Sequence, residues 1–599
     1  NCGNKVSTYT SIMMQQLIVI VVSYITIGNC LPILQNNRLH FTPSSGGKST
    51  NHINEINDAL NNAPLFTKQF NKANPLSSLE CTACKVALDA ALWKYRTPNG
   101  TYPGLPGFII TLCKYLKIET NSVCEGMIHE LQNETLFLLN KLQLTGSQLC
   151  GLIFPTSCPA NDLSWNNNKW VVPIPKSHKG KHRVSPKNSK ELKVLQISDI
   201  HIDLLYKPGS AANCKEPLCC RDNNGEVGQD KVTAGYWGTA AACDTPYWTL
   251  ENLFQRASED KFDYIIWTGD LPAHNDWSQT REGQIKLLSN LTNLLTHYFP
   301  NTPVYPSLGN HESNPVNSFP PNYVKGVNNI SWLYEALAKA WSPWLPHDAI
   351  TTVRESGFYT TLVKPGLRIV SMNMNYCNTE NFWMLLDPVD PNGELAWLVK
   401  TLDGAEEKGE VVHIIGHIPP SMTGDCLKVW RNNYHDIISR YRDIIMAQFY
   451  GHTHKDEIEI QYNDSSLAHP VSMAYIAPSV TTYTKLFPSY RTYSMDGNSW
   501  RVLDHSTYTL NLTEANTQGA SPVWKLEYSA RAEYNLTSLD LKSWHELYRS
   551  WVNDSDQSKT FQKYYTNFYK GNPPNKECDG DCKMRFLCGI QTGNYTSPC

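Results

Sequence analysis

The sequence carries little net charge, and its N-terminal apolar run is short. Its 52 basic and 55 acidic side chains leave a formal net charge of −3 with histidine neutral. A balance this close to neutral gives no sign of a nucleic-acid partner. The apolar run at residues 17–27 is too short to span a bilayer comfortably but has the length of a signal-peptide core. We expect a leader at residues 1–30, with initiation at Met13 or Met14 and a membrane anchor as the alternative.

The cysteines lack the paired C-x-x-C motifs of a structural zinc site. One such motif, Cys81 to Cys84, opens a cluster of six cysteines, and no second one follows it there. Cys2 and Cys30 fall in the expected leader, which leaves sixteen of the 18 cysteines, an even number. We therefore expect disulfide bonds, which persist in oxidising compartments.

Nine N-x-S/T sequons indicate the same secretory route. Together with the cysteines they predict a glycoprotein that is lysosomal, extracellular or both. The candidate glycosylation sites are Asn99, Asn133, Asn290, Asn329, Asn463, Asn511, Asn535, Asn553 and Asn594.

A length of 599 residues is too great for one compact domain and implies two or three. Residues 171–187 contain three prolines and a dense basic run without periodicity, which indicates an extended, solvated linker. Contact of this run with anionic lipid is the alternative. We place the linker at residues 161–192 and a flexible N-terminal segment at residues 31–78.

Five apolar, strand-like runs each end at a short polar cluster of metal-ligand residue types. Ligands placed just past the carboxyl ends of buried strands converge in one crevice. They offer oxygen and imidazole donors, too many for one tetrahedral ion but suited to two ions bridged by a shared carboxylate. The candidate ligands are Asp199, His201, Asp270, Asn310, His417, His452 and His454.

This order of motifs, D-x-H, G-D, G-N-H-E, G-H and G-H-x-H, resembles the calcineurin-like metallophosphoesterase superfamily over roughly residues 194–480. The resemblance implies an α/β metallophosphoesterase β-sandwich flanked by helices, which we place at residues 193–535. It also implies that a hydroxide between two metal ions is the nucleophile. The implied ligand sets are Asp199, His201 and His454 for one ion and Asn310, His417 and His452 for the other, with Asp270 bridging both.

Two histidines beside the candidate ligands bear on mechanism. His274 lies four residues after Asp270, and His311 directly follows Asn310. A phosphodiester leaving group departs as a poor alkoxide, so it needs a proton donor, and protonated imidazole can supply that proton best at acid pH. The alternative is that both histidines only orient ligands or cap loops.

The residue at position 273 concerns the identity of the metal. Superfamily members with a ferric ion carry a tyrosine three residues after the bridging aspartate, and here that position is Ala273. The resemblance therefore favours two zinc ions, although a site of Asp, Asn and His ligands also accepts manganese or iron.

The six clustered cysteines resemble a saposin B-type domain over residues 79–160. They have a C-x-x-C opening, a C-x10-C centre and a C-x7-C end, separated by amphipathic helical stretches. The resemblance implies an all-α domain that perturbs or extracts lipid, and a folding or autoinhibitory module is the alternative. The implied pairs are Cys81–Cys158, Cys84–Cys150 and Cys113–Cys124.

Ten further cysteines follow this cluster. Four lie in an insertion after the first strand-like run, where the resemblance implies two local disulfides, two are left to pair within the catalytic region, and four lie near the C-terminus. The expected pairs are Cys214–Cys219, Cys220–Cys243, Cys377–Cys426, Cys578–Cys582 and Cys588–Cys599.

The combined modules resemble the acid sphingomyelinase family from about residue 79 to the last residue, with a small helical, disulfide-stapled C-terminal domain at residues 536–599. The resemblance implies hydrolysis of sphingomyelin to ceramide and phosphocholine at acid pH, with the saposin-like domain presenting lipid. The partners are then sphingomyelin-containing membranes, and no stable protein partner is implied. Two alternatives stay open: a secreted phosphodiesterase acting on nucleotides or other soluble phosphoesters, and a lipid-binding protein with an inactive phosphoesterase domain.

The histidines also change the charge of the protein at acid pH. Four of the 18 are candidate ligands, and protonation of the other 14 would move the net charge from −3 towards an upper bound of +11. A cationic protein favours anionic membranes, so we expect these to be the preferred surface.

Overall fold

The computed structural model describes three stretches of the chain. They are residues 81–153 apart from 82–84, 86–87, 90 and 116, residues 169–176, and residues 190–593 apart from 229–231, 422–423, 518–520, 554–558 and 576. The predictions for the leader, for the segment 31–78 and for Cys84, Cys158, Asn594 and Cys599 therefore lie outside the described residues. The chain divides into two compact units, Asn1–Asn167 and Asn168–Cys599.

The described part of the first unit is helical. Its helices include α4 (Leu105–Tyr115), α5 (Asn121–Leu142) and α6 (Gly146–Ile153), and residues 91–95 are also helical. Helix α5 begins where the Thr120 side chain accepts a hydrogen bond from the backbone N–H of Val123, and it ends at Gln143 in the left-handed conformation.

Disulfide bonds tie these helices together. The Cys113–Cys124 disulfide joins α4 to the start of α5. Cys81 and Cys150 are also disulfide-bonded, and their predicted partners, Cys158 and Cys84, lie outside the described residues. The fold class predicted for this unit, all-α and disulfide-linked, therefore agrees with what the structure describes.

The second unit contains two large β-sheets. The first has the order β14 (Trp524–Ser529), β13 (Val502–Leu510), β12 (Ser489–Met495), β1 (Leu192–Ile197), β4 (Tyr264–Trp267) and β5 (Val304–Pro306). The second has the order β15 (Gln591–Gly593), β10 (Glu457–Tyr462), β11 (Pro470–Ile476), β9 (Ile445–Tyr450), β8 (Val411–Ile415), β7 (Leu367–Ser371) and β6 (Tyr359–Lys364). A parallel pair, β2 (Ile202–Asp203) and β3 (Thr245–Pro246), stands apart.

The two large sheets pack against each other through a core that includes hydrogen bonds. Gln196 of β1 donates to the carbonyl of Tyr450 in β9 at 3.0 Å and accepts from the Tyr493 hydroxyl of β12 at 2.7 Å. The rings of Phe449 and Tyr493 meet at 5.0 Å. Strands β4 and β8 are buried along their whole length, as expected for apolar runs in parallel positions. The predicted α/β sandwich is confirmed.

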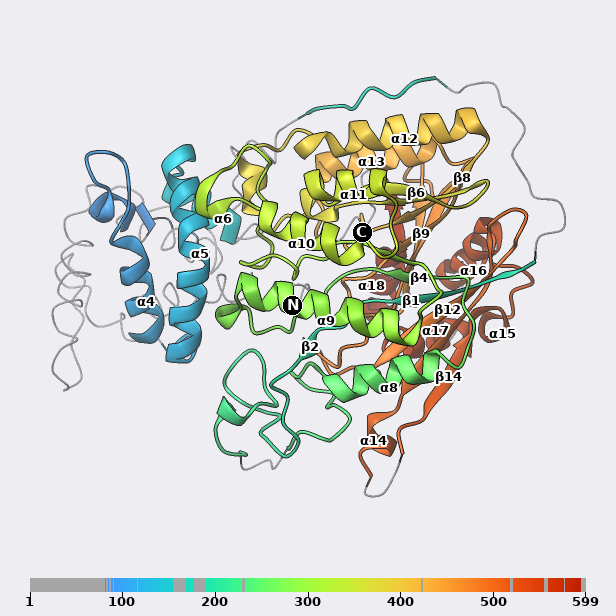
Figure 1. Ribbon diagram of the computed structural model, residues 1–599, viewed down its shortest axis with the longest axis horizontal. Helices are drawn as coiled ribbons and strands as arrows, with labels where there is room; N and C mark the ends of the chain where they lie inside the picture. Colours follow the sequence, from blue (N-terminus) through green and yellow to red (C-terminus); the bar gives the residue numbers. More distant parts are fainter. Residues whose placement is uncertain are drawn as a thin grey trace. The chain divides into compact units, whose positions relative to one another are not determined.

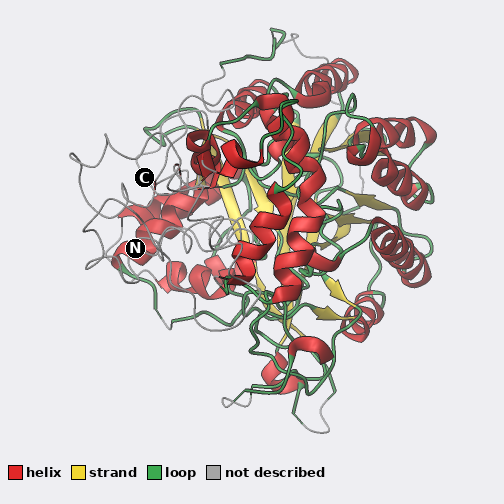
Figure 2. Cartoon of the chain, turned by 90° about the vertical axis from the view of Figure 1, so that its left-hand side faces the viewer, coloured by secondary structure: helices red, strands yellow, loops and turns green. Residues whose placement is uncertain are grey.

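Helices surround the sheets, and the strands lie in the interior (Figure 2). Helix α12 packs on β8, α13 packs on β11, and α8, α9, α10 and α11 pack in succession (Figure 1). The helices of this unit are α8 (Tyr247–Ala257), α9 (Arg281–Tyr298), α10 (Ser331–Trp341), α11 (His347–Ser356), α12 (Glu394–Lys408), α13 (Lys428–Arg440), α14 (Leu512–Ala515), α15 (Ala530–Tyr534), α16 (Leu541–Asn553), α17 (Lys559–Phe568) and α18 (Gly580–Ile590). None of the helices in the described stretches has both the length and the apolar character needed to cross a membrane.

The C-terminal region is continuous with the second sheet. Strand β15 pairs in parallel with β10, and α16 and α18 pack on that sheet. The Cys578–Cys582 disulfide forms here, Cys588 is also disulfide-bonded, and its predicted partner Cys599 is not among the described residues. The segment predicted as a small C-terminal domain thus belongs to the same compact unit as the sheets.

Part of the predicted linker is held by α13. The side-chain oxygen of Asn433 accepts from the backbone N–H of Val172 at 2.7 Å, and its amide donates to the carbonyl of Trp170 at 2.9 Å. Arg440 donates to the carbonyl of Pro175 at 2.9 Å. Residues 169–176 form no regular secondary structure, and they lie on the second unit and are not fully solvated.

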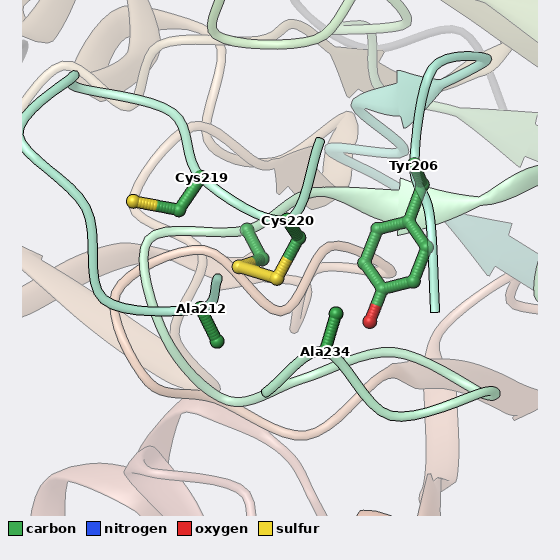
Figure 3. Packing of buried hydrophobic residues seen from close by; sticks show 6 residues of the cluster. Tyr206, Ala212, Cys219, Cys220 and Ala234 are labelled. Atoms are coloured by element: carbon green, nitrogen blue, oxygen red, sulfur yellow. A yellow bond between two sulfur atoms is a disulfide. The ribbon is translucent and has the colours of Figure 1, made fainter. Parts of the chain in front are cut away.

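The insertion between β2 and β3 has a small core of its own. Tyr206, Ala212, Ala234 and the cysteines Cys219 and Cys220 are buried together (Figure 3). The Cys214–Cys219 and Cys220–Cys243 disulfides both form within it. Elsewhere in this unit the Cys377–Cys426 disulfide also forms. The Cys214–Cys219 and Cys220–Cys243 bonds hold the irregular segment between β2 and β3 in a fixed shape.

Candidate metal centre

The candidate ligands lie just past the carboxyl ends of buried strands from both sheets. Asp199 follows β1, Asp270 follows β4 and Asn310 follows β5, while His417 follows β8 and His452 follows β9. Because β1, β4 and β5 run parallel in one sheet and β8 and β9 run parallel in the other, their ends meet at one edge of the sandwich.

One group of four donor atoms contains two histidines and two aspartates. The Nε2 atoms of His201 and His454 lie 3.2 Å apart. His201 Nε2 is 3.4 Å from Asp270 Oδ2, and His454 Nε2 is 3.6 Å from Asp199 Oδ1. Ligands around a tetrahedral ion with bonds of about 2.0–2.2 Å lie roughly 3.3–3.6 Å apart. The observed separations match that geometry.

A second group is built around the same aspartate oxygen. His417 Nε2 lies 3.0 Å from Asp270 Oδ2 and 3.0 Å from Asn310 Oδ1. His452 Nδ1 lies 3.0 Å from Asn310 Oδ1 and 3.3 Å from His417 Nε2. Asp270 Oδ2 therefore faces a histidine of each group, as a bridging carboxylate would.

The hydrogen bonds of the ligand rings show that these groups suit cations. His201 Nδ1 lies 2.7 Å from the carbonyl of Pro272, and His417 Nδ1 lies 2.6 Å from the carbonyl of Thr268. A carbonyl only accepts, so each Nδ1 carries hydrogen, and the neutral ring then presents a lone pair on Nε2. When the rings are neutral, both Nε2 lone pairs point towards Asp270 Oδ2, an arrangement that a bound cation would stabilise. Without a cation, Asp270 outweighs the effect of burial and raises the pKa of His417 to about 9.

In the metal-free protein, the positive charge near the two central carboxylates comes from neighbouring histidines. Asp199 and Asp270 are buried, and among the described residues neither forms an ion pair with arginine or lysine. Burial raises the pKa of Asp199 above its ordinary value. A buried carboxylate stays ionised only beside a cation or strong hydrogen-bond donors, so the residues present fit two metal ions.

Five candidate ligands have left-handed backbone conformations. The φ angles are 49° for Asp199, 40° for His201, 59° for Asp270, 73° for His452 and 64° for His454. Such angles are uncommon for residues with a Cβ atom and cluster where a functional constraint holds them. The turns after β1, β4 and β9 are therefore shaped to direct side chains into the centre.

Glycines allow the ligand turns to approach one another. A Cβ atom at Gly309 would lie 2.2 Å from Asp270 Oδ1, and one at Gly451 would lie 1.9 Å from Ser198 Oγ. Neither position has room for any other residue, which explains why glycine precedes Asn310 and His452 in the motifs.

Two acidic residues that support the ligands were missed by sequence reasoning. Asp425 Oδ2 lies 2.9 Å from His452 Nε2, so it fixes the ring whose Nδ1 faces the centre. Glu312 accepts from the backbone N–H groups of Asp270 and Leu271 at 3.2 Å and 2.8 Å. Glu312 stands inside the G-N-H-E motif and could have been found there, whereas Asp425 has no motif of its own.

The two candidate proton donors both reach the centre. Ring nitrogens of His274 group with those of His201 and His454, and ring nitrogens of His311 group with His201 and Asp270, within 4.8 Å in each case. Both histidines are buried. The structure therefore brings together all nine residues predicted for metal binding and proton transfer.

His274 is oriented by residues from distant parts of the chain. Asp244, which follows the insertion, accepts from the His274 backbone N–H at 2.7 Å and lies 2.9 Å from its Nδ1. Thr481 donates its hydroxyl to the same carboxylate at 2.8 Å. The ring of Tyr483 stacks on His274 with centroids 3.9 Å apart. Sequence reasoning missed these contacts because they join residues about 30 to 240 positions apart.

The surroundings of His274 and His311 affect their charges in opposite ways. Burial, with the positive charge of His311, lowers the pKa of His274 to about 3. Burial acts in the same direction on His311, but the carboxylates of Asp270 and Asp276 outweigh it and raise its pKa to about 10. Asp276 Oδ1 lies 3.4 Å from His311 Nδ1. In the metal-free protein His311 is the protonated member of the pair.

Comparison with known proteins gives two family matches. The model described as calcineurin-like phosphoesterase matches residues 192–456, which contain all seven candidate ligands. The model described as acid sphingomyelin phosphodiesterase C-terminal region matches residues 469–598. The second match begins shortly after the last ligand pair and includes Thr481 and Tyr483.

Similar proteins extend over most of the chain. Sphingomyelin phosphodiesterase of Bos taurus is 42% identical over 528 residues, which cover 87% of this chain and 83% of that protein. Sphingomyelin phosphodiesterase of Homo sapiens is 42% identical over 529 residues, covering 87% and 82%. Cyclic GMP-AMP phosphodiesterase SMPDL3A of Bos taurus is 34% identical over 411 residues, covering 66% of this chain and 87% of that protein.

Proposed function

The chain belongs to the sphingomyelin phosphodiesterase family of calcineurin-like phosphoesterases, and from this premise we propose that it hydrolyses sphingomyelin to ceramide and phosphocholine. The observation that carries the proposal is the convergence of Asp270 with six further donor residues in two groups that share its Oδ2 atom, in a chain similar to sphingomyelin phosphodiesterases along most of its length. A complete donor set argues against an inactive domain.

The residues of the centre have distinct roles in this reaction. Asp199, His201 and His454 would hold one metal ion, and Asn310, His417 and His452 the other, with Asp270 between them. When bound, two such ions supply Lewis-acid activation of water and of the phosphate oxygens. The carbonyls of Pro272 and Thr268 and the carboxylate of Asp425 keep the ligand rings in place.

His311 is the proposed proton donor to the leaving ceramide oxygen. Asp270 and Asp276 favour its charged form, so it can carry a proton where His274 cannot. The alkoxide leaving group of a phospholipid needs such a donor. His274 lies beside the ligand His201, and the two rings stack with centroids 4.0 Å apart.

The metal ions are proposed to be zinc. Imidazole and carboxylate donors suit zinc, although they also accept other divalent ions. The absence of a tyrosine at position 273 supports zinc over a ferric ion. Metal analysis of the purified protein decides between them.

The first unit is proposed to present lipid to the second at sphingomyelin-containing membranes, with anionic lipids preferred. Its disulfide-linked helices support this proposal, and Trp93 is 63% exposed there. The disulfides in both units also support a route through the secretory pathway to the lysosome, the extracellular space or both.

A second candidate function is hydrolysis of nucleotides or other soluble phosphodiesters. The similarity to a cyclic GMP-AMP phosphodiesterase favours it, but that match covers 66% of this chain, against 87% for the sphingomyelin phosphodiesterases. The smaller coverage makes it the weaker candidate.

The experiment compares wild-type protein with Asp270→Ala on two substrates, sphingomyelin in vesicles and cyclic GMP-AMP. Wild-type turnover of sphingomyelin, lost in Asp270→Ala, is the expected result. Turnover of cyclic GMP-AMP alone would favour the second candidate. Undiminished activity of Asp270→Ala on either substrate would contradict the proposed centre.

A further inference from the structure

Lys570 is a fully buried lysine that the proposed mechanism does not yet use. It follows α17 in the C-terminal region and has a left-handed φ of 55°. Its ammonium donates to the carbonyl of Ser479 at 2.9 Å, to the hydroxyl of Ser479 at 2.8 Å and to the carbonyl of Thr481 at 3.5 Å. All three acceptors belong to one short segment, residues 479–481.

No carboxylate in the described part of the chain forms an ion pair with this ammonium. Burial lowers the pKa of Lys570 well below its ordinary value. A buried polar amine is still costly, and an apolar side chain of similar volume would fill the same space without that cost. The hydrogen bonds of Lys570 therefore require an explanation beyond packing, and the position of their acceptors provides one.

The segment 479–483 contacts the metal-ligand turns directly. The backbone N–H of Ser479 donates to the carbonyl of His454 at 3.4 Å, and that of Thr481 donates to the carbonyl of Asp199 at 3.0 Å. Between them, Val480 donates to the carbonyl of Ser198 at 3.0 Å. The segment thus holds the backbones of two ligands of the same proposed ion.

The same segment also holds His274. The Thr481 hydroxyl donates to Asp244 at 2.8 Å, and Asp244 in turn lies 2.9 Å from His274 Nδ1. The ring of Tyr483 stacks on the ring of His274, with centroids 3.9 Å apart. Residues 479–482 are fully buried, so they have no solvent to replace a lost hydrogen bond.

The turn that carries Lys570 is fixed at both ends. Its backbone N–H donates to the carbonyl of Asn567 at 2.7 Å, and the side chain of Asn572 donates to the carbonyl of Lys485 at 2.9 Å. The backbone N–H of Asp456, two residues after His454, donates to the carbonyl of Phe568 at 3.2 Å. The lysine is therefore presented from a rigid turn.

We propose that Lys570 is a positioning residue of the catalytic centre. Through residues 479–483 it holds the turns of Asp199 and His454 and the orientation of His274. The C-terminal region thereby contributes to the chemistry of the centre and does more than cover the sheet. The inference rests on the proposed function, because the groups it positions are two residues assigned to metal binding and the histidine that stacks on the ligand His201.

The test uses the full-length protein with Lys570→Met, which removes the donors and keeps a long apolar side chain. The matched control is Lys583→Met, because Lys583 is a second buried lysine of the C-terminal region, with its ammonium over the ring of Phe561. Each apoprotein is titrated with Co²⁺ and its visible absorption recorded. Each zinc-loaded protein is assayed on a soluble p-nitrophenyl phosphodiester and on sphingomyelin.

The proposal predicts a Lys570→Met protein that folds, with kcat lower by about 10- to 100-fold on the soluble ester and KM little changed. The Co²⁺ spectrum should differ from the wild type only in Lys570→Met.

Equal kcat values and equal Co²⁺ spectra for Lys570→Met and Lys583→Met would overturn the proposal. If Lys570→Met does not fold, Ser479→Ala removes one acceptor and leaves the lysine in place, and wild-type kcat in that variant would overturn it as well. If the wild type hydrolyses only the soluble ester, sphingomyelin is not the substrate. Lys570→Met and Lys583→Met can then still be compared on the soluble ester. If the wild type hydrolyses neither substrate, the Co²⁺ spectra still decide on Lys570.

Discussion

Some histidines of the centre are oriented by acidic residues that no sequence motif links to them. The seven candidate ligands stand in short motifs at strand ends, so their residue types and order are visible in the chain. The roles of Asp425 and Asp276 are not visible there, because the contact of each with its histidine depends on tertiary packing. Sequence reasoning therefore finds the residues of the centre more readily than the residues that orient them.

Asp425→Asn is expected to weaken metal binding. The uncharged amide oxygen accepts from His452 Nε2 more weakly than the carboxylate does, so the ring is held less firmly and loses some basicity. We expect metal affinity to fall by about 10- to 100-fold, measured by competition with a chelator.

Asp464→Asn is the control, since Asp464 is an exposed aspartate hydrogen-bonded to Ser466. If both variants bind metal as the wild type does, the assigned role of Asp425 is wrong.

Asp276→Asn is expected to change the pH dependence of turnover. A proton donor must be protonated to act, so activity is lost as pH rises through its pKa. The Asp276 carboxylate raises the pKa of His311, and its removal lowers that pKa. The alkaline limb of the kcat profile should therefore move to lower pH. An unmoved limb in this variant would show that His311 is not the donor.

At the scale of elements, the sandwich is easier to predict than its insertions. Buried parallel strands such as β4 and β8 read as continuous apolar runs, so their positions follow from composition. The insertion between β2 and β3 has no regular period, and its shape depends on two disulfides and a few buried residues. The insertion matters for the centre because Asp244, at its end, orients His274.

Removal of the Cys220–Cys243 disulfide is expected to affect both stability and activity. The bond closes a loop of 23 residues, and a disulfide of this kind contributes roughly 2–4 kcal/mol. Cys243 directly precedes Asp244, so a loosened insertion should also disturb His274. We expect the double variant Cys220→Ala, Cys243→Ala to lose thermal stability and to lower kcat.

The matched control is Cys578→Ala, Cys582→Ala, which removes a disulfide in the C-terminal region. If the Cys220→Ala, Cys243→Ala variant loses stability without any change in kcat, the insertion does not influence the catalytic centre.

At the scale of the whole molecule, the centre joins parts of the chain that are far apart. Its ligands come from two sheets. His274 is held by Asp244 at the end of the insertion, and Lys570 acts on the centre from the C-terminal region. The family matches divide the chain near residue 460, yet the structure places residues from both matches around one site. Such convergence depends on the complete fold, and no local sequence pattern describes it.

Metal binding should therefore stabilise the second unit as a whole. A ligand that binds only the folded state at about a thousand times its Kd adds about 4 kcal/mol to the free energy of unfolding. We expect chelation to lower the Tm of the wild type, with recovery when Zn²⁺ is restored. A Tm unaffected by chelator and by added metal would mean that the buried carboxylates and histidines are satisfied without ions.

The most direct test of the central claim is release of phosphocholine from sphingomyelin in anionic vesicles by the purified protein at about pH 5, the acid range in which a protonated donor acts best. The account predicts turnover that is lost with chelator and restored by Zn²⁺. Phosphocholine release that persists after complete removal of metal, or no release from the metal-loaded protein, would contradict it.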